Sequence, residues 1–215
     1  MIQLRKAGLV ADREDVERLR IEFEKNHFAL LRDLFDSHLL SLILSYLEQS
    51  PWMKCVEAGF YSDSELELGT GVELVHFMAN VPSFLKTISE ITGYNLLTWF
   101  EGRIYRMEPN IGHKDNWHSD DTDDRLIAMS VNLSPRGYQG GLLQMREAQS
   151  HRMLAEITNT GLGDAILFRI SKDFQHRVTE VQGGEPKTAF AGWFFATKQS
   201  WRERLSSRES AWRVR

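Results

Sequence analysis

The spacing of apolar residues changes once along this chain, and this change limits the possible folds more than any other feature. Before Gly93 the apolar residues recur at three and four positions, as on one face of a helix. After Tyr94 they alternate or form short runs between Gly, Asp, Asn and Pro, as in strands joined by turns. Helices followed by strands argue against a repeating βαβ sheet and predict a β core supported by N-terminal helices.

The N-terminal part divides further at its turn formers. Residues 13–49 predict two helices, with the stretch HFALLRDLF between them as a short strand and turn, and Pro51 ends the second helix. Residues 57–71 are acidic and rich in turn formers, so they predict a surface loop that is a candidate lid. Residues 72–92 predict more helix, interrupted by Pro82 and ended by Gly93.

Six or more short strands after Tyr94 predict a closed double sheet of the jelly-roll type. A length of 215 residues suits one domain, with helical support over 1–93, the β core over 94–197 and a basic tail over 198–215. The tail has a net charge of +4 and predicts a solvated amphipathic helix or frayed end, or else a contact through Trp201 and Trp212.

Composition limits the binding partners and the metal ligands that this chain can have. A net charge of -4 argues against a nucleic-acid partner, and no apolar run is long enough to cross a bilayer, so we expect a cytoplasmic protein without a membrane partner, monomeric or homodimeric. Cys55 is the single cysteine, which excludes an internal disulfide and a thiolate metal cage. Any metal must therefore bind to histidines and carboxylates.

The sequence Trp117-His118-Ser119-Asp120 places two such ligands two positions apart, so on a strand both side chains point to one face. His176 follows a Gly-Asp turn and an apolar run, and it begins a further strand signature, HRV. Two histidines and one carboxylate form the facial triad that leaves positions open on Fe(II). We therefore predict that His118, Asp120 and His176 are the metal ligands.

Two competitors exist for this triad. His113 and Asp115 have the same spacing as His118 and Asp120, but Gly112 and Asn116 favour a solvated turn there. His151 is an alternative third ligand, although it lacks the preceding turn and apolar strand.

Lys187 opens a predicted strand on which it shares one face with Ala189, Ala191 and Trp193. A cation on the inner face of a barrel is costly unless an anion lies opposite, and a dicarboxylate cosubstrate would satisfy it. The alternative is that Lys187 reaches solvent beside Glu185.

From about Phe28 to Phe195 the chain resembles the Fe(II)/2-oxoglutarate-dependent oxygenases, closest to the prolyl 4-hydroxylase-like branch. The matching pieces, in order, are IYRME, WHSD, RLIAMSVNLS, GGLLQM, GDAILF, HRVTEV and KTAFAGWFF. The resemblance implies a double-stranded β-helix (jelly roll, cupin-like), mainly β with N-terminal helices. It also implies Fe(II) bound by His118, Asp120 and His176, with 2-oxoglutarate and O2 as cosubstrates.

The same resemblance implies roles around the cosubstrate. Lys187 would pair with the distal carboxylate, Tyr105 and Asn132 would hydrogen-bond the cosubstrate, and Leu143 and Trp193 would line its pocket. The residues themselves leave other roles open, because Tyr105 fits an ordinary core aromatic and Asn132 fits a turn cap before Leu-Ser-Pro. Many relatives in the wider superfamily have Arg where this chain has Lys187.

The resemblance implies hydroxylation of an unactivated C-H of a small molecule, amino acid or peptide side chain, with release of succinate and CO2. Two other functions remain: a cupin-like metalloenzyme that does not use 2-oxoglutarate, and a non-catalytic binding module on the same fold. The sequence does not identify the substrate.

Overall fold

The computed structural model describes residues 1–57, 61–66, 69–95, 97–121, 124–158 and 161–196. The basic tail over 198–215, with its predicted helix or contact, lies outside these residues. Within them, no helix has both the length and the apolar character needed to cross a bilayer.

The helices form close to where the spacing predicts them. Asp12 caps α1 by accepting from the Glu14 N-H at 2.8 Å, and Asp36 caps α2 by accepting from the Leu39 N-H at 2.7 Å. Gly93, with φ 74°, ends α4 in the left-handed conformation that glycine adopts at little cost. The elements before residue 93 are β1 (Ile2–Arg5), β2 (Gly8–Ala11), α1 (Arg13–Asn26), β3 (Phe28–Leu31), α2 (Ser37–Gln49), β4 (Trp52–Glu57), β5 (Tyr61–Leu66), α3 (Thr70–Ala79) and α4 (Pro82–Thr92).

The predicted loop over 57–71 is wrong for residues 61–66, which form β5. This strand pairs with β4 and with two strands of the β core, so its backbone groups are satisfied inside the sheet. Its acidic residues suggested a solvated loop, but Arg103 neutralises them: its guanidinium contacts Asp63 at 2.6 Å and Glu65 at 3.3 Å. The ion pairs with Arg103 on the neighbouring strand thus allow acidic residues to lie within a strand of the sheet.

The β core follows the predicted change in period. Its strands are β6 (Trp99–Met107), β7 (Lys114–His118), β8 (Arg125–Asn132), β9 (Gln139–Gly140), β10 (Leu143–Glu147), β11 (Met153–Ile157), β12 (Ala165–Arg169), β13 (Phe174–Val178), β14 (Val181–Gln182) and β15 (Lys187–Phe195). Over the described residues, hydrogen bonds connect eleven strands in the order β11-β10-β13-β7-β5-β6-β15-β8-β12-β3, with β4 beside β5.

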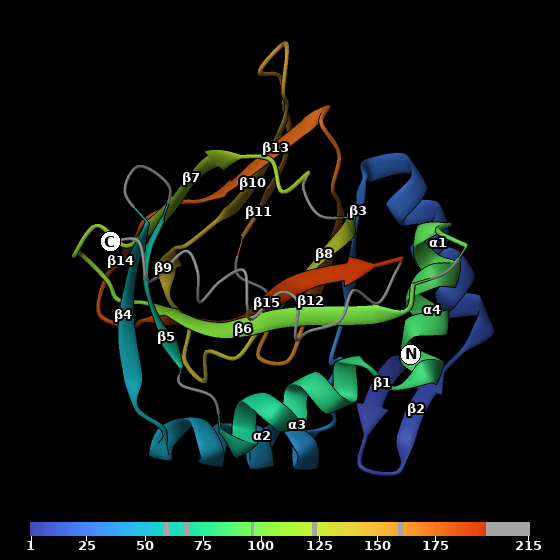
Figure 1. The fold of residues 1–215 in the computed structure, drawn as a ribbon, viewed down its shortest axis with the longest axis horizontal. Coiled ribbons are helices and arrows are strands. Elements are labelled where there is room, and N and C mark those ends of the chain that lie inside the picture. The colour runs from blue at the N-terminus through green and yellow to red at the C-terminus, as the bar shows by residue number, and fades with distance from the viewer. Residues whose placement is uncertain (58–60, 67–68, 96, 122–123, 159–160, 197–215) are drawn as a thin grey trace.

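This sheet folds over into two facing layers. Figure 1 shows β6, β15, β8 and β12 as the lower layer and β7, β13, β10 and β11 as the upper layer, while α2 and α3 lie beneath β6 and α1 and α4 lie at one side. The predicted fold, a mainly β jelly roll with N-terminal helices, is confirmed.

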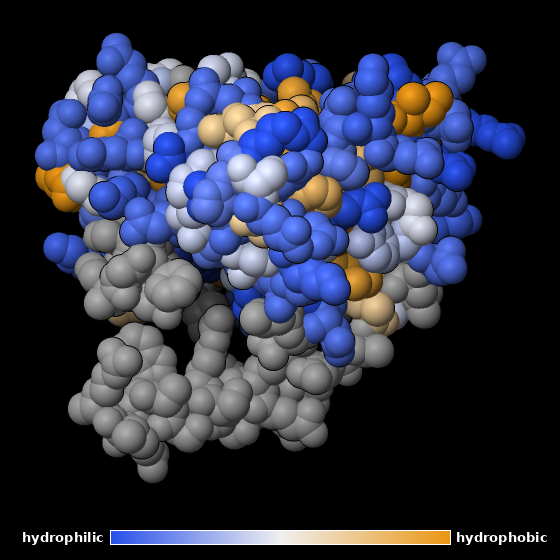
Figure 2. All heavy atoms as spheres, turned by 90° about the horizontal axis from the view of Figure 1, so that it is seen from above, coloured by the Kyte–Doolittle hydropathy of each residue, from blue (hydrophilic) through white to orange (hydrophobic). Residues whose placement is uncertain are grey.

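Two hydrophobic clusters correspond to these surfaces. The first packs the helices against the outer face of the lower layer and includes Phe84, Phe100, Phe190 and Phe194. The second lies between the layers and includes Tyr105, Leu143 and Phe168 among others. The outer surface seen from above in Figure 2 is mainly hydrophilic, with apolar side chains scattered over it. The interior between the layers is therefore the place to look for a site.

We expect Gly192→Ala to destabilise the protein by about 2 kcal/mol, because overpacking forces strands apart. Gly192 on β15 is the register partner of Gly102 on β6, and a methyl group there would clash with the Glu101 carbonyl oxygen and the Gly102 Cα. Urea unfolding measures this loss. The matched control is Gly137→Ala, because a Cβ at Gly137 meets nothing within 4 Å. Equal unfolding midpoints for the two variants would contradict the expected clash.

Candidate metal centre

Strand pairing brings two histidines together inside the upper layer. His118 ends β7, His176 lies in the middle of β13, and the two residues are register partners in the antiparallel ladder. Their ring centroids are 4.3 Å apart, and the His176 side chain is buried. Strand pairing thus brings together two side chains that are 58 positions apart in sequence.

The tautomer of His118 follows from its hydrogen bond. Its Nδ1 lies 2.7 Å from the Asn116 carbonyl oxygen, and a carbonyl only accepts, so Nδ1 carries the proton. The lone pair is therefore on Nε2. The Asp120 carboxylate lies on that side, with Oδ1 3.6 Å from His118 Nε2 and Oδ2 3.3 Å from His176 Nε2. The three predicted ligands therefore converge.

A second carboxylate lies on the other side of His118. Asp115 Oδ1 is 3.4 Å from His118 Nδ1, and Asp115, His118 and His176 offer metal-ligating atoms that all lie within 4.8 Å of one another. A register shift between β7 and β13 explains this, because Val178 pairs with Asp115 while His176 pairs with His118. Such a bulge turns residues three positions apart to the same face.

The prediction of a solvated turn at the earlier His-Lys-Asp is therefore wrong. His113 is buried with 2% of its surface exposed, and its Nδ1 accepts from the Glu108 N-H at 2.9 Å. Asp115 lies within β7 and faces the histidines. His151, the rival third ligand, is exposed in the turn between β10 and β11, outside the cluster.

The two carboxyl groups differ in pKa. Burial raises the pKa of Asp115 to about 6, although the nearby His118 and His176 charges oppose this. Burial also disfavours the charged form of Asp120, but the hydrogen bond and charge of His176, with His118 and Trp193, lower its pKa to about 2. Asp120 is thus the more acidic of the two carboxyl groups, and a carboxyl group must lose its proton to bind a metal.

The donor set fits a ferrous ion. The Nε2 atoms of two imidazoles lie 3.6 Å and 3.3 Å from the oxygens of one carboxylate, and this combination of donors suits non-haem Fe(II) with open positions. The contact between Asp115 and His118 Nδ1 resembles the outer carboxylate that orients a metal-binding histidine.

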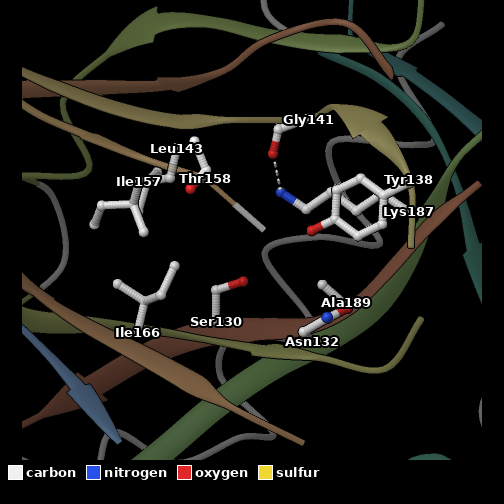
Figure 3. A pocket seen from close by; sticks show the side chains of 10 residues that line it. All are labelled: Ser130, Asn132, Tyr138, Gly141, Leu143, Ile157, Thr158, Ile166, Lys187 and Ala189. Atoms are coloured by element: carbon white, nitrogen blue, oxygen red, sulfur yellow. Dashed lines mark hydrogen bonds between the residues drawn. The ribbon is translucent and has the colours of Figure 1, made fainter. Parts of the chain in front are cut away.

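A small cavity lies beside the cluster. Ser130, Asn132, Tyr138, Gly141, Leu143, Ile157, Thr158, Ile166, Lys187 and Ala189 line it, as Figure 3 shows. Leu143 is two positions along β10 from Met145, the register partner of His176, so cavity and cluster are about 7 Å apart along the strand. The cavity volume is about 20 Å³, so a dicarboxylate has to displace side chains on entry.

Lys187 is the cation of this cavity. Its side chain is buried, and its Nζ donates to the Gly141 carbonyl oxygen at 2.8 Å and lies 6.0 Å from the Tyr138 ring centroid. Burial lowers the pKa of Lys187 to about 8, although the charge of Asp115 acts in the opposite direction. No carboxylate of the described residues forms an ion pair with it. A buried ammonium whose partner is a carbonyl oxygen fits an anionic ligand.

The other predicted cosubstrate residues separate into two groups. Asn132 and Leu143 line the cavity with Lys187, whereas Tyr105 and Trp193 do not. Asn132 accepts from the Ser134 N-H at 2.9 Å and donates to Gly161 at 3.2 Å, which is the turn-capping role. Burial raises the pKa of Tyr105, which packs in the interior cluster. Trp193 instead contacts Asp120.

Sequence reasoning missed Tyr138 and Arg103. Tyr138 reaches the cavity from the loop after β8, where its one signal is the adjacent pair Gly140 and Gly141, both with positive φ. Arg103 lies two positions before Tyr105 on the inward face of β6, and the acidic partners on β5 that hold it were assigned to a loop. Burial also raises the pKa of Tyr138 to about 12.

Known proteins resemble this chain in its core segment and its fold. Residues 102–195 match the 2OG-Fe(II) oxygenase superfamily, and no curated protein matches the sequence. A 2OG-Fe(II) oxygenase family oxidoreductase from Burkholderia pseudomallei has a TM-score of 0.68 at 15% identity, over 92% of this chain and 97% of that chain. A Pseudomonas putida prolyl-4-hydroxylase has a TM-score of 0.64 at 17% identity, over 85% and 99%.

A third similar structure is the non-haem alpha-ketoglutarate-dependent epimerase SnoN from nogalamycin biosynthesis, with a TM-score of 0.66 at 13% identity over 86% of this chain and 83% of that chain. The matched segment begins on β6, ends with β15 and contains His118, Asp120, His176 and Lys187. Fe(II) and 2-oxoglutarate, the predicted cofactors, are those of this superfamily, and the donor set fits them. The segment that carries the candidate site therefore matches the 2OG-Fe(II) oxygenase superfamily, and the fold around it is the fold of these oxygenases.

Proposed function

We propose that this protein is an Fe(II)- and 2-oxoglutarate-dependent dioxygenase of the prolyl 4-hydroxylase-like branch. It hydroxylates an unactivated C-H of a small molecule, amino acid or peptide side chain, with release of succinate and CO2. The observation that carries the proposal is the convergence of Asp120 with two imidazole Nε2 atoms, next to a cavity with a buried ammonium. Similar structures contain ligands of both kinds, namely a hypoxia inducible factor oxygen degradation domain peptide fragment and nogalamycin RO.

The chain's own residues have distinct tasks in this reaction. His118, Asp120 and His176 would hold the metal, which supplies oxygen activation when cosubstrate and substrate are bound. Lys187 binds the distal carboxylate after leaving the Gly141 carbonyl, and the apolar Leu143, Ile157 and Ile166 exclude water from the cosubstrate chain.

Anaerobic addition of 2-oxoglutarate to the Fe(II)-loaded protein tests the proposal. We expect the weak visible charge-transfer band of the chelate, and then succinate formation when a substrate panel and air are added. Succinate in place of 2-oxoglutarate is the control, because it lacks the chelating 2-oxo group and should give no band. No band at saturating 2-oxoglutarate would argue for a cupin-like metalloenzyme or a binding module instead.

A further inference from the structure

Asp120 is held from the opposite layer of the jelly roll. It follows β7 in the upper layer, but the Trp193 indole N-H on β15 donates to its Oδ2 at 2.6 Å. Arg125, at the start of β8, donates to its Oδ1 at 3.4 Å. Each carboxylate oxygen therefore has a donor from the lower layer.

The two donors also hold each other. The Arg125 guanidinium carbon lies 3.7 Å from the centroid of the Trp193 ring, which is the distance of a close cation-π stack. β15 and β8 are hydrogen-bonded neighbours, with Arg125 in register with Phe195 and Ala128 in register with Trp193. The donors are thus fixed on strands, so the carboxylate plane is fixed with them.

Among the described residues, two carboxylates lie close enough to His118 to compete as the metal ligand. Asp115 and Asp120 lie on opposite sides of the His118 ring, at 3.4 Å from Nδ1 and 3.6 Å from Nε2. The Trp193 and Arg125 donors reach both oxygens of Asp120 from the opposite layer. The orientation of the Asp120 carboxylate therefore depends on its neighbours across the barrel.

We propose that Trp193 and Arg125 are positioning residues that make Asp120, and not Asp115, the carboxylate ligand of the metal. This inference rests on the proposed function, because it takes His118 and His176 as ligands. The Trp193 hydrogen bond occupies one lone pair of Oδ2 and holds the carboxylate in one rotamer, so the entropy of ordering it is lost during folding and not during metal binding.

The test is a titration of the metal-free full-length chain with Co(II), followed by calorimetry and by the visible d-d absorption. Trp193→Phe keeps a ring under Arg125 but removes the donor, and we expect a 10- to 100-fold loss of affinity. We also expect a changed d-d spectrum, because the freed carboxylate changes its mode of coordination. A purely structural role for Trp193 would move the melting temperature and leave the spectrum of the bound metal unaltered.

Trp117→Phe is the matched control. Trp117 is also stacked by guanidinium groups, from Arg146 at 4.1 Å and Arg177 at 4.7 Å, and it precedes His118. Among the described residues, no hydrogen bond or ion pair joins Trp117 to Asp120, so affinity and spectrum should remain as in the wild type. Arg125→Lys is the second variant and should lower Co(II) affinity by a smaller factor, since it retains the charge but loses the planar stack.

The carboxylate variants distinguish the possible failures. We expect Asp120→Asn to remove tight Co(II) binding. Asp115→Asn changes only a contact of the His118 Nδ1, so it should lower the affinity by no more than about 100-fold and keep the d-d spectrum. The opposite result, or a Trp193→Phe variant with wild-type affinity and spectrum, overturns the inference while the proposed oxygenase function stands. If the wild-type chain binds no Co(II), the proposed function fails, and the inference fails with it.

Discussion

His176→Ala is expected to lower Fe(II) affinity by more than about 100-fold and to abolish succinate formation. Changes in the outer shell of a metal site already cost about 10- to 100-fold in affinity, and this change removes one of three ligands. The variant loses the His176 Nε2 that lies beside Asp120 Oδ2, so only His118 and Asp120 remain as ligands. Calorimetric titration with Fe(II) under anaerobic conditions measures the affinity.

The control for this variant is His151→Asn. His151 is exposed and has φ 57°, a conformation that Asn tolerates, so this change removes the rival histidine without distorting the turn. Metal affinity and turnover should match the wild type. A His176→Ala protein that still binds Fe(II) tightly, or a His151→Asn protein that does not, would show that the wrong histidine has been assigned to the metal.

Lys187→Met is expected to have two opposite effects. It removes the charge proposed to bind the distal carboxylate, and loss of one partner of a buried ion pair costs about 3 to 5 kcal/mol, or about 150- to 5000-fold in 2-oxoglutarate affinity. In the absence of 2-oxoglutarate the same change should raise stability by about 1 kcal/mol. The buried ammonium is disfavoured, and removing it outweighs the loss of its hydrogen bond to Gly141.

The pH dependence checks the same group. Because the pKa of Lys187 is lowered to about 8, the free protein loses this proton as pH rises above 8, whereas the bound carboxylate favours the protonated form. Wild-type affinity for 2-oxoglutarate should therefore be constant below pH 8 and fall about tenfold per unit above it. The Lys187→Met variant should show no such fall.

Lys114→Met is the control, because Lys114 is exposed at the start of β7 and the substitution changes the net charge equally. Its 2-oxoglutarate affinity and pH profile should equal those of the wild type. If Lys187→Met retains wild-type affinity, Lys187 does not bind the cosubstrate, and an enzyme that works without 2-oxoglutarate becomes the better proposal.

The fold was predictable because it depends on local patterns. Apolar spacing, the cap at Asp36 and the stop at Gly93 act within a few residues, so the sequence predicts the helices and the later strands. The short β1–β2 hairpin was not predicted, since β2 shows no alternation and the four alternating residues of β1 are too few to establish a strand without a partner.

The sequence by itself indicated a jelly roll with N-terminal helices and two candidate ligands, His118 and Asp120, two positions apart. Only the tertiary structure brings His176 next to them. Only the tertiary structure decided that Asp115 also faces the cluster, because a bulge in β7 breaks the two-residue alternation on which sequence reasoning relies. It likewise decided that Trp193 donates to Asp120 and does not line the cavity around Lys187. Contacts between layers depend on how the sheet folds over, and no local spacing encodes that geometry.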